Sequence, residues 1–194
     1  RTHDTSLLGS IDLYHLSDKK QLLWQEKITK ETFKKIADID LNVTEVIFDE
    51  RQINYRNKSV FHVLKDRCLK LGLYQKDYTL VQTPVFILAD TLTNRFVNLI
   101  NRLGVPIDST VLKHVVFRTN EKEQILITFV ATQEHVEGLE PVIVKLSREK
   151  EVVGITININ TNEKRILGEQ SIIKYGVNEI TQQLKHFEVV INDR

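Results

Sequence analysis

The chain has 194 residues, of which 41% are hydrophobic and 27% are charged, and its formal net charge is +1. This length can bury a sizeable core, and the composition is ordinary for a soluble globular protein. A net charge so close to zero provides no global field that would attract a polyanion, so any basic site must be a local patch.

Several classes are excluded at this stage. No segment approaches the roughly 18 apolar residues that cross a bilayer, and there is no signal-peptide stretch, so we expect a cytoplasmic protein with no membrane partner. Cys68 is the only cysteine, which excludes an internal disulfide or a multi-cysteine metal site. Methionine is absent and the chain opens on Arg1, so we expect a piece of a longer protein.

The first half of the chain predicts a helix, four strands and a second helix. Ser17 is the expected N-cap of a helix that runs to about Ala37 with apolar residues at helical spacing. Strand-like runs follow as VTEVIFD, YRNKSVFHVL, RCLKLGLYQ and YTLVQ. The second helix is predicted over residues 88–103, and Gly104 ends it.

The second half predicts two hairpins. The first joins VLKHVVFRT to QILITFVAT, and the second joins VVGITININ to RILGEQSIIKYG, with a short helix at 142–149 between them. Another short helix at 178–184 and a last strand, HFEVVIN, complete the chain. Because βαβ alternation is missing, we predict an α+β fold: a mixed, largely antiparallel sheet with a long N-terminal helix and a second helix packed on it.

Motifs for catalysis or cofactor binding are missing from the sequence. Neither G-x-G-x-x-G nor a P-loop is present, and the six histidines show no zinc-like spacing. The neighbouring carboxylates Asp38 and Asp40, or Glu149 and Glu151, are interpreted as solvated surface charges. The residues alone therefore indicate a binding or positioning module.

Six motifs follow one another along the chain: LYHLSDKKQLLWQEKI, YRNKSVFHV, KLGLYQKDYTLVQTPV, LKHVVFRTNEKEQILITFVAT, VVGITININTNEKRILGEQSIIKYG and FEVVINDR. In this order they resemble motifs of the RNA uracil-5-methyltransferase family, and of its ribosomal-RNA branch in particular. The resemblance implies a parent enzyme that uses S-adenosylmethionine to methylate C5 of a uridine in 23S ribosomal RNA or in transfer RNA. In such a parent a cysteine thiolate adds to C6 of the uracil, which makes C5 nucleophilic.

The chain departs from the family pattern in two ways. The four iron–sulfur cysteine positions correspond to Leu8, Ile11, a non-cysteine residue just upstream of them, and Thr83, so the cluster is predicted to be absent. The chain also stops at Arg194, where the family continues into its catalytic domain. We expect cofactor binding and catalysis in that missing domain, and therefore no catalytic residue, cofactor or metal in this segment.

The resemblance also implies a division of the chain. Residues 1–42 are expected to form an N-terminal segment and helix that docks on the missing methyltransferase domain. Residues 43–194 are expected to form the central RNA-binding domain. Whether the chain counts as an enzyme stays open, because the parent would be one and this segment alone would have no activity.

The candidate RNA-contacting residues lie on predicted strands. In YRNKSVF, alternate side chains place Arg56 and Lys58 on one face together with His62, at about 6.6 Å per two residues, and Arg and Lys bind phosphate. In VVGITININ, the apolar residues alternate with Asn158 and Asn160, which are expected as exposed amides that bind base edges or 2′-hydroxyls. The complete predicted set is Arg56, Asn57, Lys58, His62, Lys113, Arg118, Asn158 and Asn160.

Other interpretations of these residues stay open. Arg56 and Lys58 could face water on a one-sided sheet, and Arg118 could hold an interdomain contact. An exposed tyrosine such as Tyr55 or Tyr74 could stack on a flipped-out base. The rival functions are a stand-alone RNA-binding or protein-interaction module and a small-molecule enzyme that uses Cys68.

Overall fold

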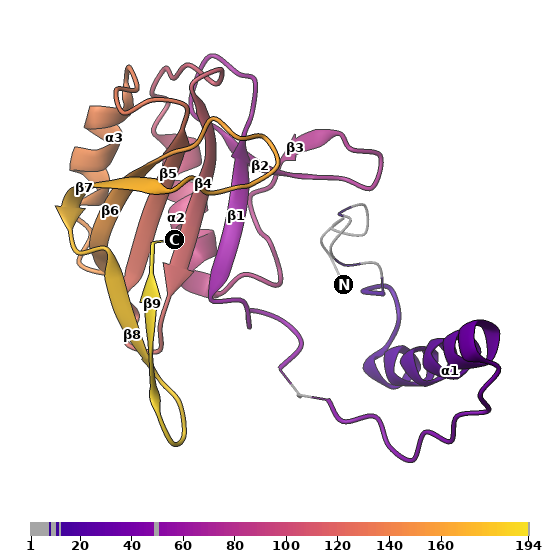
Figure 1. Ribbon diagram of the computed structural model, residues 1–194. Helices are drawn as coiled ribbons and strands as arrows, with labels where there is room; N and C mark the ends of the chain where they lie inside the picture. The colour runs from indigo at the N-terminus through magenta and orange to yellow at the C-terminus, as the bar shows by residue number, and fades with distance from the viewer. Residues whose placement is uncertain (1–7, 9–10, 12, 49–50, 194) are drawn as a thin grey trace. The chain divides into compact units, whose positions relative to one another are not determined.

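The computed structural model describes residues 8, 11, 13–48 and 51–193 (Figure 1). The chain divides into two compact units, Arg1–Gln52 and Ile53–Arg194, and each is described by itself. No helix in the described ranges is long and apolar enough to cross a membrane.

Helix α1 (Asp18–Ala37) is the regular element of the first unit. Ser17 has the extended backbone of an N-cap, and the helix ends at Asp38, whose φ of 54° is left-handed. Lys34 pairs with Asp38 at 2.9 Å and with Asp40 at 3.0 Å, so the C-terminal turn is closed by charge as well as by backbone. The predicted helix and its N-cap position are confirmed.

The strand predicted at VTEVIFD is wrong. Residues 43–48 contain no strand, and Ile47 is 90% exposed. β-branched residues favour a strand only where a partner strand and a buried face exist. This segment has neither among the described residues.

The second unit is built on a seven-stranded sheet in the order β3-β2-β1-β4-β5-β6-β7 (Figure 1). Every neighbouring pair is antiparallel except β5 and β6, which are parallel. The predicted mixed, largely antiparallel sheet is confirmed. The strands are β1 (Lys58–Val63), β2 (Leu71–Tyr74), β3 (Leu80–Gln82), β4 (Leu112–Thr119), β5 (Ile125–Ala131), β6 (Val152–Ile159) and β7 (Gln170–Gly176).

Two helices follow strands of this unit. Asp90 caps α2 (Thr91–Arg102), because its carboxylate accepts a hydrogen bond from the Thr93 backbone N–H at 2.7 Å. Helix α2 contacts β4 and β2. Helix α3 (Leu139–Leu146) lies in the crossover between the parallel strands β5 and β6, which need a long connection.

The aromatic part of the core lies on one face of the sheet. Cross-strand partners share a face, so Phe61, Val115, Phe117 and Phe129 point to the same side. These residues are fully buried together with the apolar positions of the helices, namely Phe96, Val97, Ile100, Leu139, Val142 and Leu146. The opposite face of the sheet carries the polar residues of the candidate site.

The end of the chain forms a separate two-stranded sheet, β8 (Glu179–Gln183) and β9 (Glu188–Asn192). The helix predicted at 178–184 is therefore wrong. Ile180 and Leu184 have helical spacing, but the segment pairs instead with the β-branched run of β9, with Ile180 opposite Ile191. The last predicted strand is confirmed as β9.

Candidate nucleic-acid interface

The register of β1 and β4 builds the candidate site. Lys58 pairs with Arg118, Val60 with Val116 and His62 with His114, so these side chains share the face opposite the aromatic core. We call Lys58, His62, His114 and Arg118 the basic strip. The predicted alternation on β1 therefore holds for Lys58 and His62.

Lys58 and Arg118 form a pair of like charges directly across two strands. Burial lowers the pKa of Lys58, and the Arg118 charge lowers it further. Burial also lowers the pKa of Arg118, which is only 8% exposed, and its Nε has no hydrogen-bond partner. Like charges at such a position destabilise a sheet unless an anion compensates them. No described carboxylate forms an ion pair with Lys58.

Asp193 is the acidic group whose charge acts on Arg118, where it opposes the effect of burial on the pKa. Asp193 is 1% exposed, and neither of its carboxylate oxygens accepts a hydrogen bond from a described residue. Its backbone carbonyl accepts a hydrogen bond from the Thr128 hydroxyl at 3.5 Å. The C-terminal segment thus covers the polar face at β5, next to Arg118.

The hairpin β8–β9 is fixed to the β4–β5 turn by two further hydrogen bonds. The Asn120 side chain donates to the Thr181 carbonyl at 2.8 Å, and the Gln183 backbone N–H donates to the Glu121 carboxylate at 2.9 Å. Val116, Leu126, Thr128 and Thr156, which share the face of the basic strip, are buried. The part of this face that remains open lies over β1 and β2.

His62 and His114 meet at the open part of the face. Their ring centroids are 4.8 Å apart, and Tyr74 lies 4.6 Å from His62 on the other side. Burial lowers the pKa of His62. Burial, followed by the charges of His62 and Lys113, lowers the pKa of His114 to about 4. Both rings are therefore neutral at pH 7, and they offer aromatic surface and hydrogen-bonding groups instead of charge.

Arg56 and Asn57 lie outside the basic strip. The Arg56 guanidinium lies 5.5 Å from the Phe86 ring, which packs edge-on against Phe61 on the core face. The prediction that Arg56 shares a face with Lys58 is wrong, because residue 56 precedes β1 and forms an isolated bridge with Ala89. Asn57 is exposed, and its backbone carbonyl accepts a hydrogen bond from Thr119 at 2.8 Å.

The prediction that Asn158 and Asn160 form an exposed amide ladder is also wrong. Asn158 is 0% exposed; its side-chain NH₂ donates to Gly168, Gln170 and Ser171, and its Oδ1 accepts from Gly168 at 2.7 Å. Asn160 is partly exposed, and its side chain donates to the carbonyls of Arg165 and Ile166. Both amides hold the connection between β6 and β7.

Lys113 lies at the other end of β4 from Arg118. It occupies a bulge between Leu112 and His114, is exposed, and donates to the Ser109 carbonyl at 3.5 Å. The extra residue of a bulge interrupts strand alternation. Lys113 therefore adds an exposed positive charge beside His114 at the edge of the basic strip.

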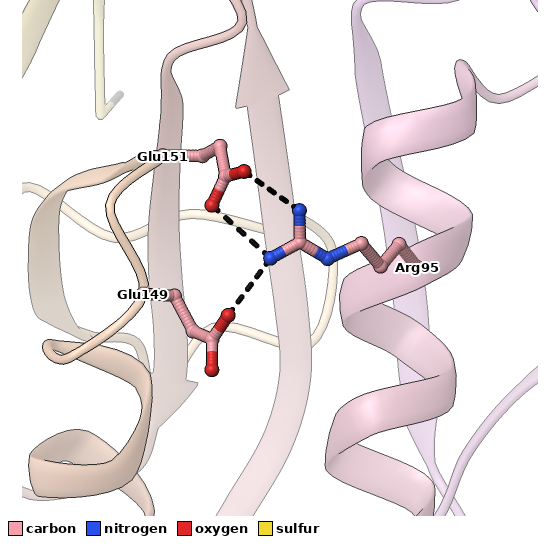
Figure 2. A network of polar contacts seen from close by, with 3 residues as sticks. All are labelled: Arg95, Glu149 and Glu151. Carbon is pink, nitrogen blue, oxygen red and sulfur yellow. Dashed lines mark hydrogen bonds and ion pairs between the residues drawn. The ribbon is translucent and has the colours of Figure 1, made fainter.

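Arg95, Glu149 and Glu151 form a second charged cluster (Figure 2). Arg95 of α2 donates two hydrogen bonds to Glu151, at 2.8 and 3.1 Å, and one to Glu149, at 2.8 Å. The hydrogen bond from Arg95 is the main reason why the pKa of Glu151 falls to about 2. The interpretation of Glu149 and Glu151 as merely solvated is therefore wrong, because they tie α2 to the start of β6.

Possible metal ligands and the single cysteine, Cys68, occur in the described part of the chain. No three His, Cys, Asp or Glu side chains gather there as metal ligands. The single cysteine and the residues Leu8, Ile11 and Thr83 do not fit an iron–sulfur cluster, which needs thiolate ligands. Cys68 is half-buried in a loop, where its backbone bridges to Pro106.

Sequence reasoning missed His114 as part of the site. It was one of six scattered histidines, and its position opposite His62 depends on the pairing of two strands about fifty residues apart in sequence. A signal was present, because His114, Val116 and Arg118 alternate in LKHVVFRT. The register between β1 and β4 places His114 opposite His62 and Arg118 opposite Lys58, and this pairing forms the site.

The chain is similar to proteins that are named RNA methyltransferases. No protein-family model matches the chain. Curated relatives include an uncharacterized RNA methyltransferase of Clostridium tetani, 26% identical over 94% of this chain and 43% of the relative. Another, from Streptococcus agalactiae, is 30% identical over 91% of this chain and 42% of the relative. The chain thus spans less than half the length of these relatives.

A solved structure has the same fold. The Pyrococcus abyssi tRNA (uracil-54, C5)-methyltransferase, in complex with S-adenosyl-L-homocysteine, aligns with a TM-score of 0.65 and 14% identity. The alignment covers 98% of this chain and 47% of that protein. The homologues of this chain are RNA methyltransferases. The structural match at 14% identity shows that the fold is shared.

Proposed function

We propose that this chain is the central substrate-binding domain of an S-adenosylmethionine-dependent RNA (uracil-5-)-methyltransferase that acts on 23S ribosomal RNA in the cytoplasm. The proposal assigns only the holding and orienting of RNA to these residues. Cofactor binding and methyl transfer are assigned to other parts of a longer protein. The length of the relatives, about twice that of the matched region, supports this division.

The pair formed by Lys58 and Arg118 carries the proposal. Two cations across neighbouring strands, with lowered pKa values, cost stability in the free protein. Lys58 is exposed and supplies a point charge that a phosphate group can approach, whereas Arg118, which is 8% exposed and lies beside Asp193, adds its positive charge from beneath the surface. Phosphate contacts of this kind position RNA and do not read its sequence.

The first unit has a separate role in this proposal. Helix α1 has no buried residue, and its exposed apolar side chains include Leu23, Trp24 and Ile28. Exposed apolar residues at helical spacing are suited to a partner surface. We assign residues 1–42, which make up most of the first unit, to docking on the catalytic domain, and residues 43–194 to RNA binding.

Salt-dependent RNA binding tests the proposal. The probe is a fluorescein-labelled single-stranded segment of 23S ribosomal RNA, with transfer RNA as a second probe. Lys58→Glu should weaken binding and reduce the slope of log K against log salt by about one. Lys145→Glu is the matched control, because it makes the same charge change on α3, at the other face of the sheet.

Two results would count against the proposal. An unchanged salt slope in the Lys58→Glu variant would remove β1 from the interface. Equal effects of Lys58→Glu and Lys145→Glu would show that only net charge matters. Tighter binding of transfer RNA than of the ribosomal segment would keep the RNA-binding role and change the substrate.

A further inference from the structure

The hairpin formed by β2 and β3 carries an unusual residue at its tip. Its turn is closed by hydrogen bonds from the Gln75 N–H to the Thr79 carbonyl, at 2.9 Å, and from the Tyr78 N–H to the Gln75 carbonyl, at 3.0 Å. Tyr78 has a φ of 64°, in the left-handed region, and its side chain is 86% exposed. A bulky residue in this conformation is a genuine outlier.

The turn does not need the tyrosine ring. The left-handed position of such a loop suits glycine, which adopts positive φ at no steric cost. The Asp77 carboxylate already stabilises the turn by accepting a hydrogen bond from the Thr79 N–H at 2.9 Å. The ring of Tyr78 is exposed to solvent and contributes little packing, so folding gives no reason for its presence.

The tip of the β2–β3 hairpin follows directly on the exposed part of the polar face over β1 and β2. Tyr74, on the same hairpin, lies two residues after Gly72, which pairs with His62, and the Tyr74 and His62 rings are in contact. Lys76 adds an exposed positive charge between the two tyrosines. Aromatic rings next to cations are the combination that binds single-stranded nucleic acid through base stacking and backbone attraction.

We propose that Tyr78 is a stacking site for an unpaired RNA base, presented by the β2–β3 hairpin at the end of the basic strip. This inference rests on the proposed function and deepens it. The ligand class is single-stranded RNA, because duplex bases expose no ring face. Stacking adds affinity that does not depend on salt, whereas Lys58 and Arg118 add affinity that does.

The test compares Tyr78→Gly, Tyr78→Phe and Glu123→Gly in the full chain. Glu123 is a matched control, since its φ is 55° and its turn has the same two hydrogen bonds, between Asn120 and Gln124 and between Glu123 and Asn120. Both glycine variants should raise Tm, because glycine suits left-handed backbone. The probes are an oligouridine of about 12 nucleotides and an abasic strand with the same number of phosphates.

Tyr78→Gly should weaken oligouridine binding about five-fold or more with an unchanged salt slope. Tyr78→Phe and Glu123→Gly should bind like the unaltered chain, and no variant should change binding of the abasic strand. Equal oligouridine binding by Tyr78→Gly, or an equal loss on the abasic strand, would overturn the stacking site. If Lys58→Glu still flattens the salt slope, the proposed function survives that result. Absence of oligouridine binding by the unaltered chain at about 100 µM would overturn both.

Discussion

Asn158 shows how one buried amide organises a long connection in this protein. Its side chain forms hydrogen bonds with four backbone or side-chain groups at and just before the start of β7, and Asn158→Ala removes all four bonds. We expect that variant to lose about 1–3 kcal/mol of unfolding free energy, since unsatisfied buried polar groups are costly. Chemical denaturation measures the change.

Asn160 provides the comparison for this prediction. It lies two residues along and binds the same connection, but from a more exposed position. Asn160→Ala should therefore cost less than Asn158→Ala. A larger loss in Asn160→Ala would contradict the assignment of Asn158 as the main anchor.

His114 makes stability depend on pH. Its pKa is lowered from 6.5 to about 4 in the folded protein. Above pH 6.5 the ring is neutral in both states and has no effect. As pH falls, the unfolded chain takes up the proton first, so the contribution of His114 reduces stability progressively between pH 6.5 and about 4.

Thermal unfolding of His114→Gln and of the unaltered chain, measured from pH 8 to pH 4, tests this effect. The Tm of His114→Gln, relative to that of the unaltered chain, should rise as the pH falls from 6.5 to about 4. NMR titration of the imidazole should give a pKa well below its ordinary value. A pKa at or above 6.5 would show that the ring is not buried beside His62.

At the scale of elements, the Arg95 cluster joins α2 to the loop before β6 (Figure 2). The pKa of Glu151 is lowered from 4.5 to about 2, so the ion pair stabilises the folded protein above pH 4.5 and is lost as the pH falls toward 2. Arg95→Gln should lower Tm slightly at pH 7, because exposed ion pairs contribute little. The deficit should vanish near pH 2.

Arg148→Gln is the control for that experiment. Arg148 is exposed near the same loop and forms no ion pair with a described residue. It should leave Tm unchanged at both pH values. A pH-independent deficit in Arg95→Gln would mean that the side chain acts through packing on Phe96, which it also contacts at 5.0 Å.

Local patterns predicted most of the elements. The long helix and the strands that contain Phe61, Phe117 and Phe129 were recognised, because amphipathic spacing and β-branched runs are local signals. The segment 43–48 and β8 were misassigned, since each depends on whether a distant strand pairs with it. Tertiary context overrides strand propensity in both cases.

At the scale of the whole molecule, the two faces of the sheet differ in their covering. Helices α2 and α3 belong to the core face, while the C-terminal hairpin and Asp193 cover part of the polar face. Alternation in single strands placed Lys58 and His62 on the same face. Alternation could not show that Asn158 is buried, because the residues that bind its side chain, Gly168, Gln170 and Ser171, lie outside β6.

The most direct test of the account is to map the RNA-contacting surface residue by residue. Backbone amide NMR shifts of the labelled chain are followed while single-stranded 23S ribosomal RNA is added. The account predicts perturbations at Lys58, His62, His114 and the β2–β3 hairpin, and none on α2 and α3. Perturbations confined to α2, α3 or α1 would contradict it.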